Sequence, residues 1–134
     1  MYQIKLYTNT IPKSLNVMLR KHWSGRKKEM KQLEDELRLN ILRTYNPKER
    51  VLLKKVMPLE KVALVELTYY FPDKRKRDLD NFSGKSIFDA LKGWAIKDDN
   101  SEVVSKVNTE FRCVKGMSGV EVILNYKEVK NEKN

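Results

Sequence analysis

Apolar and polar residues alternate in three stretches of the chain, and a fourth stretch is apolar almost throughout. Alternation is typical of a strand with one buried face, and a short apolar run rich in β-branched and aromatic residues is typical of a central strand. The turn formers between Gly116 and Gly119 predict that the last two strands form a hairpin. The strands predicted in this way are residues 2–7, 61–71 (the apolar run), 103–111 and 120–126.

Between the strands, apolar residues recur at the three- and four-residue spacing of helices. Ser14 is a plausible N-cap for a first helical segment, which Ser24 and Gly25 interrupt. Residues 46–60 have no clear periodicity and contain two prolines and many lysines, so they receive no assignment. The further helices predicted are residues 26–45 and residues 82–92, with Gly93 as the C-cap of the second.

The order of elements is therefore β-α-α-β-α-β-β. This order predicts an α+β fold with a small mixed sheet and helices packed on one side. The length of 134 residues fits one domain with an adequate core. We expect the domain to span residues 1–127 and the charged residues 128–134 to form a frayed tail.

The composition narrows the class of partner. The chain has 28 Lys and Arg against 18 Asp and Glu, a net charge of +10, which favours a polyanion such as nucleic acid. One cysteine and one histidine exclude an internal disulfide and any multi-histidine or multi-cysteine metal centre. No apolar run is long enough to span a membrane, so we expect no membrane partner and a reducing, cytoplasmic location.

The candidate chemistry lies after the apolar strand, in the sequence Lys-Arg-Lys-Arg-Asp-Leu-Asp-Asn of residues 74–81. In an extended segment Asp78 and Asp80 point the same way, and two converging carboxylates favour a divalent cation such as Mg²⁺ or Mn²⁺. A helix to Lys92 followed by a reversal at Gly93 would bring Asp98 or Asp99 back beside them. Each feature alone has an ordinary explanation, as a helix cap or a solvated charge.

Three carboxylates within a basic segment suit phosphodiester hydrolysis. A bound divalent cation lowers the pKa of a water molecule and clamps the attacking and leaving oxygens. Lys85, one turn into the helix, is a candidate for stabilising the charge that develops on the phosphate. Residues 74–77 would neutralise flanking phosphates.

These motifs together resemble the RusA family of Holliday junction resolvases, found in bacteria and prophages. The resemblance rests on residues 77–81, on Lys85–Leu91 and on Lys97-Asp98-Asp99, and it extends to the opening loop around Asn16 and Arg20 and to the C-terminal turn. One departure is the distance from Asp80 to Lys85, which is one residue longer than usual in the family, with Gly84 as the extra residue. Either the helix begins late or Lys85 is rotated away from the site.

The resemblance implies a homodimeric, Mg²⁺-dependent endodeoxyribonuclease that acts in DNA recombination and repair. It would nick four-way junctions symmetrically, in a bacterial or phage-infected cell, without a small-molecule cofactor. The alternatives are a nuclease of the same fold that acts on forks or flaps, and a catalytically inactive DNA-binding protein. For the dimer interface the first candidates are Tyr69, Phe71, Phe88 and Trp94. The residues implied at the site are Asp78, Asp80 and Asp99 as metal ligands, Lys85 as catalytic lysine, and Lys74, Arg75, Lys76, Arg77, Asn81, Asn16 and Arg20 as DNA contacts.

Overall fold

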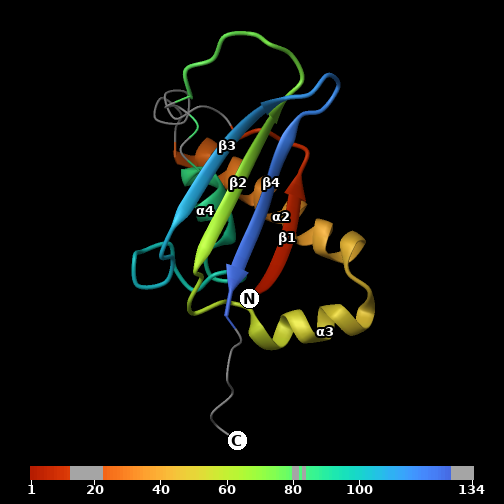
Figure 1. Ribbon diagram of the computed structural model, residues 1–134, viewed down its shortest axis with the longest axis vertical. Helices are drawn as coiled ribbons and strands as arrows, with labels where there is room; N and C mark the ends of the chain where they lie inside the picture. Colours follow the sequence, from red (N-terminus) through yellow and green to blue (C-terminus); the bar gives the residue numbers. More distant parts are fainter. Residues whose placement is uncertain (13–22, 80–81, 83, 128–134) are drawn as a thin grey trace, which may run out of the picture.

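A computed structural model of the chain describes residues 1–12, 23–79, 82 and 84–127 (Figure 1). It confirms a small α+β domain with the predicted element order and a four-stranded mixed sheet. The predicted Ser14 cap and the tail at 128–134 lie outside the described residues. The elements are β1 (Tyr2–Thr8), α2 (Trp23–Thr44), α3 (Pro47–Val56), β2 (Leu64–Phe71), α4 (Lys85–Leu91), β3 (Val107–Cys113) and β4 (Gly119–Tyr126).

The sheet has the strand order β1-β4-β2-β3, so the apolar strand β2 is an inner strand, as predicted. β2 is parallel to β3 and antiparallel to β4, and β1 is antiparallel to β4. The predicted hairpin of the last two strands is wrong, because β2 lies between them. The turn at 114–118 carries the chain past the end of β2, and the polar β3 is left at the edge while the apolar β4 takes an inner position.

The core lies between one face of the sheet and the helices α2 and α4, which lie behind it in Figure 1. Alternate residues of β2 point into it, and the middle of β4 shows the same alternation in burial. The predicted stripe of α2 is confirmed, since Leu33, Leu37 and Ile41 are buried. Burying each such side chain stabilises the fold by about 1.5–3 kcal/mol.

Three helix boundaries differ from the prediction. Helix α2 runs through Ser24 and Gly25 without interruption. Residues 47–56 form α3, whose capping box pairs the side chain of Asn46 with the backbone of Glu49 and the side chain of Glu49 with the backbone of Asn46. Helix α4 begins at Lys85 and not at residue 82.

The edge strand β3 also differs. It begins at Val107 and not at residue 103, and nearly all of it is exposed. Val103 and Val104 are instead buried in the turn before it, where the backbone N–H groups of both donate to the carbonyl of Asn100. The place of β3 at the edge is not the cause of its exposure, because the other edge strand, β1, buries Ile4, Leu6 and Thr8 on the face that packs against α2.

Glu36 on α2 fixes the segment that follows β1. Its carboxylate accepts hydrogen bonds from the hydroxyl groups of Thr8 and Thr10. Burial alone would raise the pKa of Glu36, but these hydrogen bonds outweigh it and hold the pKa below its ordinary value. The end of β1 is thereby tied to the helix behind the sheet.

Candidate active site

The basic loop that follows β2 is organised by Arg77. Its guanidinium donates to the carbonyl oxygens of Asp73 (3.1 Å) and Arg75 (2.9 Å) and to the Asp73 carboxylate (2.9 Å). The same group lies 4.2 Å from the centre of the Phe71 ring, a cation–π contact. Only 19% of the Arg77 side chain is exposed. Arg77 therefore folds the loop around itself, and its expected contact with DNA stays a prediction.

Asp73 completes this arrangement. Its carboxylate accepts a hydrogen bond from the backbone N–H of Arg75 and another from Arg77, and together these lower its pKa. With Asp73 and Arg77 paired, the other basic side chains of the loop point outward. Lys74, Arg75 and Lys76 are exposed, although the guanidinium of Arg75 also lies 3.6 Å from the Asp73 carboxylate. Asp78 beside them is exposed as well.

Aromatic packing anchors the far end of the loop. The ring of Phe82 packs against Tyr69 (5.8 Å between centroids) and Phe71 (5.4 Å), both on β2. Both β2 rings are buried in the core, so they cannot form the dimer interface suggested from the sequence; Phe88 and Trp94 are half-buried. Burial raises the pKa of Tyr69 to about 12, so its hydroxyl stays protonated.

Gly84 explains the extra residue before Lys85. It is the N-cap of α4 and has φ = +85°, a conformation that right-handed helices do not contain. A Cβ at this position would lie 2.7 Å from Cδ1 of Leu67. Of the two explanations for the longer spacing, the late helix start is the one observed, and Lys85 is the first residue of α4.

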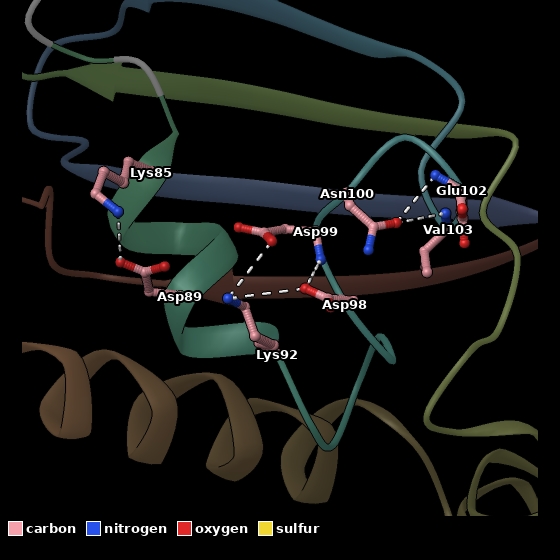
Figure 2. A network of polar contacts seen from close by, with 8 residues as sticks. All are labelled: Lys85, Asp89, Lys92, Asp98, Asp99, Asn100, Glu102 and Val103. Carbon is pink, nitrogen blue, oxygen red and sulfur yellow. Dashed lines mark hydrogen bonds and ion pairs between the residues drawn. The ribbon is translucent and has the colours of Figure 1, made fainter.

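One side of α4 carries alternating charges at the spacing i, i+4 and i+7 (Figure 2). Lys85 lies 3.4 Å from the carboxylate of Asp89, and the Lys85 side chain is 65% exposed. The ammonium of Lys92, just past the helix, lies 3.5 Å from Asp99 and 3.8 Å from Asp98. Neither Asp89 nor Lys92 was among the predicted site residues, although their spacing places them in line with Lys85.

The loop after α4 presents two adjacent carboxylates. Asp98 accepts a hydrogen bond from the backbone N–H of Asp99 (2.8 Å), and this bond is the main cause of the lowered pKa of Asp98. The charge of Asp99 in turn raises the pKa of Lys92, which therefore remains a cation. This pair of carboxylates already attracts one positive charge, as a site for a divalent cation must.

The route by which Asp98 and Asp99 reach this position differs from the one predicted. Helix α4 has seven residues, so it advances about 10 Å and not the 18–20 Å expected. Residues 92–96 form a tight turn, closed by a hydrogen bond from Gly93 to Ile96, in place of an extended return. The contacts of Asp99 are accordingly with Lys92 at the C-terminal end of α4.

The structure describes only some of the predicted site residues. Asp80, Asn81, Asn16 and Arg20 lie outside the described residues. Within the described residues no three His, Cys, Asp or Glu side chains gather closely enough to hold a metal ion. A site made by Asp78, Asp80 and Asp99 thus stays a prediction. Asp78 and Asp99 offer the exposed carboxylate oxygens that Mg²⁺ prefers, so their chemistry fits the ion.

Comparison with known proteins identifies the class of protein. Residues 5–125 match the family described as endodeoxyribonuclease RusA, and no curated protein matches the chain. The match covers the loop after β2, helix α4 and the two carboxylates in the loop after it. The chain belongs to the RusA family of Holliday-junction-resolving endonucleases. None of its described helices is both long and apolar enough to cross a membrane.

Proposed function

We propose that this protein is a Mg²⁺-dependent endonuclease that resolves four-way DNA junctions by paired nicks. The observation that carries the proposal is the family match, which spans every predicted ligand: Asp78, Asp80 and Asp99. The bound ion would lower the pKa of a water molecule and stabilise the leaving oxygen, and Mn²⁺ would substitute for it. Asp78, Asp80 and Asp99 would hold this ion.

The chain's own cations serve the rest of the reaction. Lys74, Arg75 and Lys76 point outward from the loop and bind the phosphates that flank the scissile bond. Lys85, with its exposed ammonium at the start of α4, stabilises the negative charge that develops on the phosphoryl oxygens. Arg77 holds the loop in shape, so that Asp78 keeps its place next to these cations.

The active unit is proposed to be a two-fold homodimer. A four-way junction has approximate two-fold symmetry, and resolution requires two paired nicks, so two active sites related by a two-fold axis match the substrate. The process served is DNA recombination and repair in the cytoplasm of a bacterial or phage-infected cell. Sedimentation at micromolar concentration tests the dimer, and a monomer that makes both nicks in one binding event refutes it.

The decisive experiment compares labelled substrates. A mobile four-way junction, a fork and a plain duplex are incubated with the protein, with Mg²⁺ or with a chelator. The proposal expects paired nicks in the junction that require the metal. Preferential cutting of the fork would instead indicate a nuclease for other branched DNA, and binding without cutting would indicate an inactive DNA-binding protein.

Variants assign the carboxylates in the same assay. Asp78→Asn and Asp99→Asn should each reduce cleavage at least about 100-fold, while junction binding persists or tightens because a repulsive charge near phosphate is removed. Asp35→Asn is the matched control, since Asp35 is an exposed carboxylate on α2 that pairs with Lys31. Wild-type cleavage by either Asp78→Asn or Asp99→Asn would show that the ligand assignment is wrong.

A further inference from the structure

A groove lined by lysines lies at the end of the sheet where β2 begins and β4 ends. Its volume is about 760 Å³. Four ammonium-bearing side chains line it, and each comes from a different segment. They are Lys55 in the last turn of α3, Lys61 before β2, Lys97 in the loop after α4, and Lys127 after β4.

The groove has more positive charge than its own residues neutralise. Among the described residues that line the groove, four are lysines and one, Glu60, is acidic. The lining therefore has three positive charges in excess. Glu60 lies 3.7 Å from Lys97, and Lys61 donates to the backbone carbonyl of Glu102 at 2.7 Å. Among the residues that the structure describes, Lys55 and Lys127 have no carboxylate partner. Like charges gathered around one hollow repel each other unless an anion enters it.

The net charge of +10 is not spread evenly over the domain. The sheet face that points away from α2 and α4 carries three glutamates at alternating strand positions, Glu66, Glu110 and Glu121. Lys5 and Arg112 are the basic residues on that face, and Arg112 is paired with Glu110. A polyanion is therefore disfavoured on the open sheet face and favoured at the groove.

We propose that the groove binds the sugar–phosphate backbone of a DNA duplex arm. The rim lysines contact phosphate oxygens, and the apolar residues Val56, Met57 and Pro58, which also line the groove, contact the sugars. Lys97, which lines the groove, immediately precedes Asp98 in the sequence, whereas the basic loop with Asp78 follows the other end of β2, so the groove would bind an arm away from that loop. The proposal rests on the proposed function, since it assigns the place of an arm of the same substrate. It also gives a role to residues 55–60, part of the segment left unassigned from the sequence.

Two charge-matched double variants test the groove. Lys55→Gln with Lys127→Gln removes the two rim lysines that have no acid partner, outside the candidate catalytic residues. Lys5→Gln with Lys48→Gln removes the same charge from the open sheet face and from the first turn of α3. Junction affinity is measured at salt concentrations from about 50 to about 300 mM, the range in which the salt dependence reports counterion release.

The groove pair should lower the slope of log K against log salt by about 1.8, because each lost phosphate contact contributes about 0.9. At 0.1 M salt this corresponds to roughly eightfold weaker binding per lost contact. The control pair should change the slope by much less. On junctions whose arms are cut to a few base pairs, the difference between the two pairs should vanish.

Equal weakening by both pairs overturns the groove, because it would show a general effect of net charge. A difference that persists on the shortest arms also overturns it, because the groove would then bind something other than an arm. Wild-type protein that neither binds nor cuts junctions refutes the proposed function itself, which separates that failure from failure of the groove. Unchanged thermal unfolding of all variants shows that the fold is intact.

Discussion

Replacing Arg77 with alanine separates a residue that organises the loop from one that contacts DNA. The guanidinium donates three hydrogen bonds within the loop and stacks on Phe71. Buried charged hydrogen bonds contribute about 1.5–3 kcal/mol each, but the Asp73 side chain is 45% exposed, so solvent screens part of this. With about 0.5–1 kcal/mol from the cation–π contact, we expect Arg77→Ala to destabilise the closed loop by about 2 kcal/mol.

A loss of about 2 kcal/mol increases the open population of the loop roughly 30-fold. Trypsin cleaves after lysine and arginine, and the loop presents Lys74, Arg75 and Lys76. Limited tryptic digestion under native conditions should therefore cut the Arg77→Ala loop about 30-fold faster than the wild-type loop. Cleavage of junctions should fall as well, because Asp78 loses its support.

Arg75→Ala is the matched control, because it removes the same charge from a side chain that is 78% exposed and has one contact with Asp73, at 3.6 Å, in place of the three hydrogen bonds of Arg77. This variant should lower the salt slope of DNA binding by about 0.9 and leave proteolysis at the remaining sites unchanged. The reasoning is refuted if Arg77→Ala resists trypsin as the wild type does while its salt slope drops by the amount expected for Arg75→Ala.

Three further outcomes are expected. Gly84→Ala should destabilise the domain by about 2–4 kcal/mol in urea unfolding, because it adds both backbone strain and the clash with Leu67. Gly93 has φ = +93° but open space around it, so Gly93→Ala should cost only the strain, about 1–2 kcal/mol. Equal destabilisation by the two variants would contradict the clash. Because its pKa is lowered in the fold, ionised Glu36 stabilises the fold above about pH 4.5, and this contribution is lost as the pH falls below that value. Glu36→Gln should therefore lower Tm at pH 7 and have little effect at pH 3. The same Tm difference at both pH values would refute this role of Glu36. Lys85→Ala should lower turnover about 100-fold with little change in junction Kd, and a parallel loss of both would make Lys85 a binding residue.

The sequence predicted the inner strand β2 and the buried stripe of α2, because both depend on local periodicity. The prediction failed for strand pairing, because the choice of partner depends on segments that are far apart in the sequence. The hairpin of β3 and β4 was expected from the turn formers between Gly116 and Gly119, yet β2 separates the two strands. In β2, buried residues alternate with half-buried ones, and the strand has a neighbour on each side, β3 and β4. No property of the turn at 114–118 reveals this.

At the site, residue types were predictable and their partners were not. The carboxylates and cations were recognised by type and spacing, and Gly84 was recognised as an insertion. The use of Arg77 inside its own loop depends on the curvature of residues 73–77, which no periodicity encodes. Helix α3 was not predicted, because the surrounding lysines and prolines obscured its periodicity. Asn46, Pro47 and Glu49 are nevertheless residues typical of a helix start.

The sheet order has a consequence for synthesis of the protein on the ribosome. β1 is made first, yet among the described strands it pairs with β4 alone, and the side chains of Gln3 and Asn125 meet across 122 positions of sequence. Until β4 emerges, β1 has no strand to pair with and β2 has an open edge toward it. The sheet that carries the basic loop after β2 is therefore completed only when nearly the whole chain has left the ribosome. We therefore expect a nascent fragment that lacks β4 to have no complete sheet and no nuclease activity.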